Sequence, residues 1–272
     1  MRVNSVLITG TTSGLGRALL EHYAGSGVKV ISVNRRRVPE LEARHPSARF
    51  EQVDVRSTEE VAALVRGLAD SGELPDVFIL NAGINRLDND EVFDLALYRD
   101  VIETNLYGVL NFIAPLTRLP PTGVERHVVA VSSVVTYAGN PYGLGYQTSK
   151  QALTRCFDVW ATMYEGTDLV FKQVVLGPVR TDIYTMEDRL PGWMARLKRI
   201  GSASLDDTVR ALARFSRSRK RKLIHPWRAL ALFGLARLAR RVLPASAQGR
   251  RTLDGKPRRT GPVGSPSVRD PR

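Results

Sequence analysis

Three glycines follow the first apolar run of the chain and precede its first helical stretch. Residues 3–9 predict a buried strand, residues 17–24 predict a helix, and glycines at 10, 14 and 16 lie between them. Glycines in this position let the backbone approach a pyrophosphate, whose charge is stabilised by the N–H groups at the helix start. The segment therefore predicts a dinucleotide site, with a flexible glycine loop as the alternative. The residues expected to contact the dinucleotide here are Gly10, Thr12, Ser13, Gly14, Leu15 and Gly16.

Apolar runs and helical stretches alternate along the next part of the chain. Further strands are expected at residues 28–33, 50–53, 77–80, 128–131 and 170–176, and helices at residues 58–69, 98–116 and 146–164. This alternation is typical of an α/β fold with a doubly wound parallel sheet, the Rossmann fold, covered by helices on both faces. The length of 272 residues and the hydrophobic share of 43% suit a single such domain. We assign it to residues 1–226.

The end of the second expected strand predicts which dinucleotide binds. About 20 residues beyond the glycines, an acidic side chain usually holds the ribose hydroxyls of NAD, whereas arginine accommodates the 2′-phosphate of NADP. Asn34 occupies the acidic position here, and Arg35 and Arg36 follow it. A neutral amide followed by guanidinium groups attracts the phosphate. These residues favour NADP(H) over NAD(H), with a solvated basic loop as the alternative.

Tyr146 and Lys150 are four residues apart in a stretch expected to be helical, and Ser133 precedes them. Residues i and i+4 are neighbours on one face of a helix. An ammonium beside a phenol favours phenolate and lowers the phenol pKa from about 10, which would make Tyr146 a proton shuttle. The Tyr-x-x-x-Lys spacing alone is a weak signal, because an exposed tyrosine and a solvated lysine produce it as well.

Taken together, these segments resemble the short-chain dehydrogenase/reductase family, in its compact single-domain branch. The resemblance covers about residues 3–184 and is carried, in the family's order, by Thr9-Gly10-x-x-x-Gly14-x-Gly16, Asp54-Val55, Asn81-Ala82-Gly83, Asn105, Ser133, Tyr146-x-x-x-Lys150 and Gly177-Pro178-Val179-Arg180-Thr181. The chain departs from the family pattern in two places: Leu80 stands where Asn is usual, and Leu176-Gly177 stands where Pro-Gly is usual. Both positions shape loops rather than take part in the chemistry.

The resemblance implies a role for each member of the catalytic set. Tyr146 would exchange a proton with the substrate oxygen, and Lys150 would lower the pKa of Tyr146 and hold the nicotinamide ribose. Ser133, rather than Ser132, would hydrogen-bond the same oxygen, because it lies 13 residues before Tyr146, as is usual in the family. Asn105 would bend its helix and hold a water molecule that connects Lys150 to solvent; an ordinary asparagine inside a helix is the alternative.

The resemblance also implies further cofactor contacts. They are made by Asp54 with Val55 at the adenine, by Asn81 with Gly83 at the adenine ribose, by Thr181 at the nicotinamide carboxamide, and by Ala82 and Val179 in the same motifs. Asp, Asn, Gly and Thr are also common where strands end, so plain turn formation is the alternative for each.

Most of the positive charge lies in the C-terminal part of the chain. Residues 196–272 hold 21 Lys and Arg against 4 Asp and Glu, a net of +17, whereas residues 1–195 hold 19 against 23, a net of −4. A basic run at residues 217–222 and a short edge strand at residues 223–226 lead into an amphipathic helix at residues 227–243, with Trp227 on its apolar side. We place this helix in a separate segment, residues 227–244, and expect a disordered tail at residues 245–272.

The basic helix has three possible partners: its own domain, a partner subunit of a homo-oligomer, or an anionic membrane surface. We favour packing against protein over peripheral membrane contact through residues 227–243. Nucleic acid is a weaker alternative, because the stretch contains no recognition motif. Since residue 3 already begins a strand, we expect no signal peptide and a cytoplasmic protein, with contact at the membrane periphery as the alternative.

A few residues bear on other kinds of chemistry. Cys156 is the single cysteine, so no internal disulfide is possible, and we expect a buried thiol. The four histidines show no metal-ligand spacing, and we expect no metal. Residues 183–194 stand where the family has a segment that covers the substrate, and Trp193, Met194 and Leu197 could close over an apolar substrate or pack within a helix.

The expected function is an NADP(H)-dependent oxidoreductase that transfers hydride between nicotinamide and a carbonyl or secondary alcohol substrate. One alternative is an epimerase or dehydratase of the same fold, which usually has a longer C-terminal substrate domain than this chain. The other is a non-catalytic NADPH sensor that acts through the basic C-terminal segment. A sensor has no need of Tyr146, Lys150 and Ser133 together, which argues against it. The substrate, the physiological direction and the number of subunits stay open.

Overall fold

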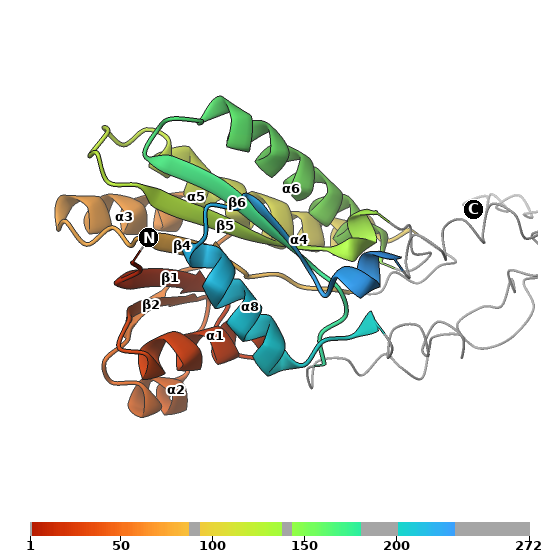
Figure 1. Cartoon of the computed structure of the whole chain (residues 1–272), viewed down its shortest axis with the longest axis horizontal. Coiled ribbons are helices and arrows are strands. Elements are labelled where there is room, and N and C mark those ends of the chain that lie inside the picture. Colours follow the sequence, from red (N-terminus) through yellow and green to blue (C-terminus); the bar gives the residue numbers. More distant parts are fainter. Residues whose placement is uncertain (1, 87–92, 138–142, 181–200, 232–272) are drawn as a thin grey trace, which may run out of the picture.

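The computed structural model describes residues 2–86, 93–137, 143–180 and 201–231. Within these residues, seven strands form one parallel sheet in the order β3-β2-β1-β4-β5-β6-β7 (Figure 1). They are β1 (Ser5–Thr9), β2 (Lys29–Asn34), β3 (Arg49–Gln52), β4 (Val77–Leu80), β5 (Arg126–Ser133), β6 (Leu169–Leu176) and β7 (Lys222–His225). The strand order reverses between β1 and β4, where ligands bind in folds of this kind. The α/β doubly wound sheet expected from the sequence is confirmed.

Helices cover both faces of the sheet (Figure 1). One face carries α1 (Gly14–Gly25), α2 (Pro39–Arg44) and α8 (Leu205–Arg217), and the other carries α3 (Thr58–Asp70), α4 (Leu95–Ile102), α5 (Gly108–Leu116) and α6 (Leu144–Met163). Strand β4 shows why both faces are apolar: Val77 and Ile79 belong to the core under α1, whereas Phe78 and Leu80 belong to the core under α3 and α5. Side chains of a strand alternate between faces, so a central parallel strand needs apolar residues at every position.

The helix expected at residues 98–116 is interrupted. Between α4 and α5 lies one turn of π-helix, η1 (Glu103–Tyr107), which contains the buried Asn105. A π-helical turn inside an α-helix often marks a functional site, because it bulges the backbone and redirects a side chain. Asn105 therefore lies in an irregular turn of the helix, and the bend that the resemblance implied there stays a prediction.

Two helices were not expected from the sequence. The six residues of α2 are too few for a helical period to be recognised. The longer α8 begins at a cap in which the Ser204 hydroxyl accepts a hydrogen bond from the Asp207 N–H at 3.0 Å, and it buries Val209 and Leu212 against the sheet. Its outer face is so highly charged that the apolar stripe is easily overlooked.

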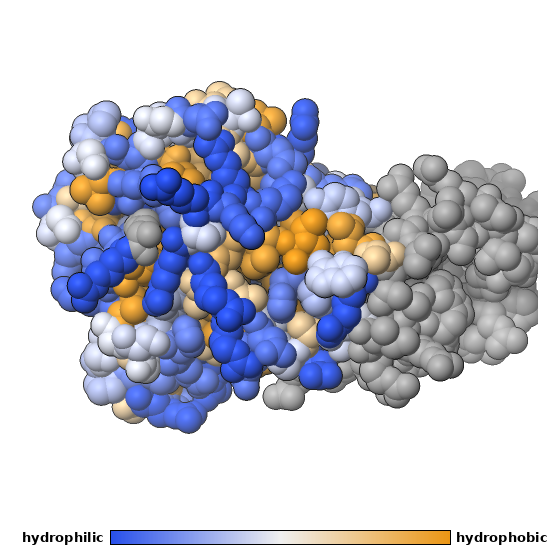
Figure 2. All heavy atoms as spheres, in the orientation of Figure 1, coloured by the Kyte–Doolittle hydropathy of each residue, from blue (hydrophilic) through white to orange (hydrophobic). Residues whose placement is uncertain are grey.

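The chain after β7 turns back onto the fold. Strand β7 is the expected short edge strand, one residue earlier than predicted, and the next helix begins at Trp227. Trp227 was expected on the packing side, but its side chain is 75% exposed, whereas Ala229 is fully buried. Figure 2 shows an apolar area where β7 approaches this helix, beside hydrophilic side chains over α8. The predicted tail and most of the predicted amphipathic helix lie outside the described residues.

No helix in the described part of the chain combines the length and the apolar character needed to cross a membrane.

Candidate active site

Tyr146 and Lys150 lie on the first turns of α6, facing the carboxyl ends of β4 and β5. The Lys150 Nζ atom lies 5.8 Å from the centre of the Tyr146 ring and donates a hydrogen bond to the Val131 carbonyl at 2.8 Å. Lys150 is buried, and its desolvation lowers the pKa of the ammonium to about 8. The group is therefore still cationic at neutral pH, beside the phenol that it was expected to activate.

Ser133 and Ser132 end β5, and the structure separates their roles. The Ser132 hydroxyl is buried and bonds to the Thr154 hydroxyl at 2.7 Å, which fastens β5 to α6. Ser133 points to the other side of the strand, is half-buried, and accepts a long hydrogen bond of 3.4 Å from the Val135 N–H. Alternation along the strand thus turns Ser133 away from the contact between Ser132 and Thr154, and the expected substrate contact of Ser133 stays a prediction.

Asn105 uses its amide to hold neighbouring backbone. Its Oδ1 atom accepts from the Ile84 N–H at 2.7 Å, and its Nδ2 group donates to the Ile84 carbonyl at 2.8 Å and to the Ser149 hydroxyl at 3.2 Å. These bonds connect the loop after β4 with α6, one residue before Lys150. Asn105 therefore positions the site, and the water-binding role implied by the resemblance stays a prediction.

The glycine loop between β1 and α1 has the shape of a phosphate cradle. Gly10 adopts φ +74°, and a Cβ atom on Gly16 would lie 2.0 Å from the Gly10 carbonyl oxygen, so only glycine fits at position 16. Ser13 precedes α1 without capping it, and the first turn of the helix holds no acidic side chain. Its N–H groups are thus open to an anion, and these residues fit the pyrophosphate of a dinucleotide.

Asn34 holds the glycine loop through its side chain. Its side chain is buried and faces the glycine loop: Oδ1 accepts from the Thr11 N–H at 2.8 Å, and Nδ2 donates to the hydroxyls of Thr11 at 2.8 Å and Ser32 at 3.0 Å. These bonds hold the glycine loop, and the expected contact of Asn34 with a cofactor stays a prediction. Asn34 acts on the cofactor site by fixing the glycine turn.

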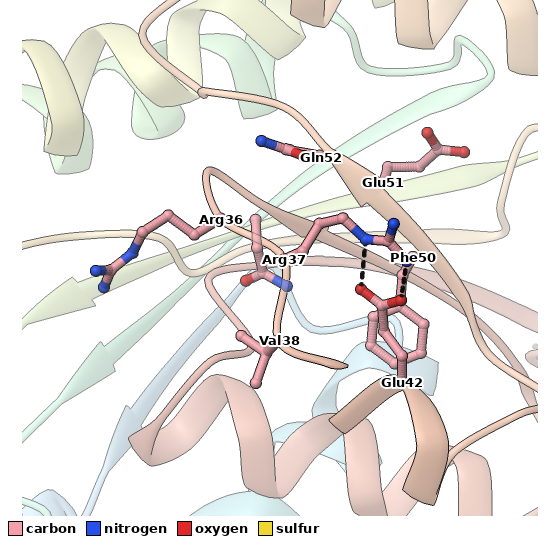
Figure 3. Close-up of a pocket in the computed structure, with 8 residues that line it drawn as sticks. Arg36, Arg37, Val38, Glu42, Phe50, Glu51 and Gln52 are labelled. Atoms are coloured by element: carbon pink, nitrogen blue, oxygen red, sulfur yellow. Dashed lines mark hydrogen bonds and ion pairs between the residues drawn. The ribbon is translucent and has the colours of Figure 1, made fainter. Parts of the chain in front are cut away.

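Two of the arginines after Asn34, Arg36 and Arg37, line a cavity of about 240 Å³ at the carboxyl ends of β2 and β3 (Figure 3). Arg37 is held by Glu42, with Nε–Oε1 and Nη2–Oε2 distances of 3.1 and 2.5 Å. Arg36 points away from that pair in Figure 3. Arg35 and Arg36 are both exposed, and neither guanidinium is paired with a carboxylate of the described residues. They are the cations of this loop that an incoming phosphate can use.

Asp54 and Val55 follow β3 on the same side of the site. The Asp54 carboxylate forms a fork with the Arg56 guanidinium, with an Oδ2–Nη2 distance of 2.6 Å. Hydrogen bonding to Arg56, with a smaller contribution from the charge of Arg35, lowers the pKa of Asp54. Val55 packs against Gly108, where a Cβ atom would lie only 2.8 Å from a Val55 methyl group. The position of this loop is thus fixed by α5 and by an ion pair.

Asn81, Ala82 and Gly83 follow β4 and meet the glycine loop. The Asn81 side-chain amide donates to the Thr9 carbonyl at 3.1 Å, and the Thr9 hydroxyl accepts from the N–H groups of Asn81 and Ala82 at 3.0 and 2.9 Å. A Cβ atom on Gly83 would lie 3.1 Å from Asn105 Oδ1 and 3.6 Å from Lys150 Nζ. A side chain at position 83 would crowd Asn105, so glycine lets the loop after β4 lie close to Asn105 and Lys150.

The last motif is described in part. Val179 is buried and pairs as an isolated bridge with Ala203. Thr181, the segment at residues 183–194 and Leu197 lie outside the described residues, so their expected roles stay predictions.

Several residues that build the site were not predicted as members of it. Thr9, Thr11 and Ser149 hold Asn81, Asn34 and Asn105 respectively, through the bonds given above. Thr9 stands inside the first family motif, which was the one available signal. The other two are small polar residues whose partners are more than 20 positions away.

Two further expectations concern metals and the thiol. In the parts of the chain that the structure describes, no group of three His, Cys, Asp or Glu side chains is placed to hold a metal ion. Cys156 was expected to be buried, but it is only half-buried on α6, and desolvation raises the pKa of its thiol.

Comparison with known proteins agrees with this geometry. The family model for short chain dehydrogenases matches residues 4–189. The chain is 29% identical to an uncharacterized oxidoreductase of Myxococcus xanthus over 194 residues, 67% of this chain and 75% of that protein. It is 30% identical to a short chain dehydrogenase of Pseudocercospora fijiensis over 199 residues, 68% of this chain and 63% of that protein.

Solved structures resemble the fold as well. A short-chain dehydrogenase from Streptomyces avermitilis superposes with a TM-score of 0.74 at 20% identity, covering 89% of this chain and 94% of that one. A 4-hydroxyisoleucine dehydrogenase complexed with NADH gives 0.71 at 18% identity, over 81% and 96% of the two chains. A serine dehydrogenase complexed with NADP+ gives 0.69 at 20% identity, over 81% and 93%. At these identities the structures show the fold alone, whereas the family model covers all four expected catalytic residues, and this chain is accordingly an oxidoreductase of the short-chain dehydrogenase family.

Proposed function

We propose that this chain is an NADP(H)-dependent oxidoreductase that interconverts a carbonyl and a secondary alcohol, with Tyr146 as the general acid and base. The observation that carries the proposal is the buried Lys150 ammonium beside the Tyr146 ring, on the helix that packs against β5, the strand that ends at Ser133. A buried cation is unfavourable unless it has a task or full compensation. Among the described residues, Lys150 Nζ makes one hydrogen bond, although an ammonium can donate three.

Each catalytic side chain has a task that its geometry supports. Tyr146 gives a proton to the substrate oxygen during reduction and takes it back during oxidation. Ser133 donates a hydrogen bond to the same oxygen and stabilises the charge that develops there. Lys150 favours the phenolate of Tyr146 and offers its remaining N–H groups to ribose hydroxyls. Asn105 keeps the loop after β4 at a fixed distance from α6. The nicotinamide, when bound, supplies or accepts the hydride.

The cofactor would lie across the carboxyl ends of the strands. The glycine loop and the uncapped start of α1 would hold its pyrophosphate, and Asp54, Val55, Asn81 and Gly83 would line its adenosine half. Similar folds are solved with NADH and with NADP+, so the fold accepts both cofactors. What supports NADP(H) here is the pair of exposed guanidinium groups, Arg35 and Arg36, at the place of the 2′-phosphate, together with the absence of a carboxylate at position 34.

Replacing Tyr146 tests the reaction. The Tyr146→Phe variant keeps the ring but loses the proton, so turnover of any accepted ketone should fall by about a hundredfold to ten-thousandfold. The dissociation constant for NADPH should hardly change. A panel of ketones and alcohols, followed by the nicotinamide absorbance, gives the measurement. Tyr164→Phe, a half-buried tyrosine just after the far end of α6, is the matched control and should retain turnover. Wild-type rates in Tyr146→Phe would refute the assignment.

Replacing Arg35 tests the cofactor preference. Arg35→Ala should raise the dissociation constant for NADPH about tenfold, because a charge-assisted hydrogen bond contributes about 1.5–3 kcal/mol. The constant for NADH should change little. Arg37→Ala removes an equal charge from the same loop, but Arg37 is already held by Glu42, so it is the matched control. Equal weakening of both cofactors by Arg35→Ala would contradict the 2′-phosphate assignment.

A further inference from the structure

The first turn of the helix after β7 is packed unusually close to the end of β6. Ala229 is fully buried, and a Cβ atom built on Gly177 would lie 2.5 Å from the Ala229 methyl group and 3.2 Å from the ring of Pro226. The Gly177 N–H donates to the His225 carbonyl at 2.8 Å. Any other residue at position 177 would push the turn away. This contact gives a physical reason for the glycine in a loop where the chain departs from its family.

Ala229 also supports the loop that carries Ser133. It forms an apolar cluster with Val134 and Val175, and the half-buried side chains of Tyr137 and Ile224 pack against the cluster. Val134 is the residue directly after Ser133 and begins the short 3₁₀ helix η2 (Val134–Thr136). Only one packed side chain therefore separates Ala229 from the backbone of the serine.

Arg228 supports the loop at the other side of the site. Its Nη2 group donates to the Ser202 carbonyl at 2.7 Å. The next residue, Ala203, pairs with the loop after β6: its N–H donates to the Pro178 carbonyl at 2.9 Å, and its carbonyl accepts from the Arg180 N–H at 3.0 Å. Val179 lies inside this pairing. The Arg228 guanidinium thus holds Ser202, and the next residue, Ala203, holds the Val179 loop in place.

We propose that Arg228 and Ala229 form a positioning turn, in which the two residues together set the distance between the Ser133 loop and the Val179 loop. This inference rests on the proposed function, since it assigns the substrate contact to Ser133 and the nicotinamide end to the Val179 loop. Both loops are braced by two consecutive residues of one turn, so displacing that turn moves the substrate oxygen site relative to the cofactor. The pyrophosphate and adenosine contacts lie on α1, β2, β3 and β4 and are untouched by it.

The proposal predicts a selective defect in Arg228→Ala. With the carbonyl substrate, kcat/KM should fall about tenfold, because misplacing reacting groups by even 1 Å has large effects on rate. The dissociation constant for NADPH should change little, because the residues proposed to hold its pyrophosphate and adenosine lie away from this turn. In hydrogen exchange, the amides of Arg180 and Ala203 should lose protection, which reports on the brace without any substrate. Arg228→Lys keeps a charged donor, so it should restore part of kcat/KM and part of the exchange protection.

Two controls belong to the same experiment. Trp227→Ala removes a large, exposed side chain from the same turn, and Arg219→Ala removes the same charge from an exposed position outside the brace. Neither should change rate or exchange. A second probe, Ala229→Gly, opens a gap against Val134 and should lower kcat/KM with little effect on NADPH binding.

The outcomes separate this inference from the function on which it rests. If Tyr146→Phe is inactive and Arg228→Ala keeps the wild-type rate and hydrogen exchange, the positioning turn is overturned and the proposed function stands. If Tyr146→Phe keeps its turnover, the proposed function is overturned. Hydrogen exchange at the amides of Arg180 and Ala203 would then still decide whether Arg228 holds the Val179 loop. An equal loss of exchange protection throughout the fold in Arg228→Ala would also overturn the proposal, because it would indicate general destabilisation.

Discussion

Two lysines are buried on opposite faces of this sheet, and they have different surroundings. Lys150 lies on α6 against β5, whereas Lys172 lies on β6 under the end of α8. Desolvation lowers the pKa of both ammonium groups to about 8. Lys172 donates to the carbonyls of Phe215 at 2.7 Å and Ser218 at 2.6 Å, and its Nζ atom lies 4.6 Å from the Phe215 ring. Lys150 has one carbonyl partner among the described residues.

The comparison shows that burial and a lowered pKa do not by themselves identify a catalytic lysine. The Lys172 ammonium caps the C-terminal end of α8, where the helix dipole and the unpaired carbonyls favour a cation. Its donors are used within the fold. Within the described residues, the Lys150 ammonium has one hydrogen-bond acceptor, and it lies beside the Tyr146 ring and close to Gly83. The number of partners within the described residues, rather than the depth of burial, separates the two lysines.

The largest expected effect comes from Lys150→Met. Turnover should fall by about a hundredfold or more, because Tyr146 loses the charge that favours its phenolate. Stability should rise at the same time. A pKa lowered from 10.5 to about 8 corresponds to about 3 kcal/mol of unfavourable burial at neutral pH, against about 1.5–3 kcal/mol for one charged hydrogen bond. Steady-state kinetics and urea unfolding at pH 7 give both quantities. If Lys150→Met were less stable than the wild type and kept its turnover, the proposed difference between Lys150 and Lys172 would be refuted.

Lys172→Met should have the opposite pattern. It relieves a similar desolvation but removes two short charged hydrogen bonds and a cation–π contact, so the free energy of unfolding should fall by about 2 kcal/mol. Turnover should stay at the wild-type level, because Lys172 lies on the face opposite to Tyr146. Measuring Lys150→Met and Lys172→Met side by side sharpens the contrast, and a large loss of turnover in Lys172→Met would remove it.

The smallest effect concerns pH. Each lysine binds a proton more tightly in the unfolded chain than in the folded one, so its contribution to stability is least below pH 8 and is gained as pH rises toward 10.5. Each group adds at most about 1.4 kcal/mol per pH unit to the slope. In urea unfolding between pH 8 and pH 9.5, either Met variant should show a smaller upward slope than the wild type. Taking the difference from the wild type cancels the other titrating groups.

The local sequence was sufficient to predict the elements and their order. Apolar runs such as residues 77–80 became strands within a residue or two, because burial on both faces requires apolar side chains at every position. Gly10 and Gly16 also act locally, since a positive φ and a close backbone approach exclude a Cβ atom. Tyr146 and Lys150 share a helix face because of their spacing, which any helix would enforce.

Only the tertiary structure decided which polar groups are already occupied. The Asn34 amide bonds to Thr11, 23 positions earlier, a contact that motif spacing did not predict. Trp227 was expected to pack, yet the neighbouring Ala229 is buried because Gly177 leaves room only for a methyl group. Hydrogen-bond partners and packing gaps are set by residues far apart in the chain. Periodicity and motif spacing describe neighbours along the chain, so they determine helices, strands and candidate groups, whereas the folded contacts determine which of those groups is free to act.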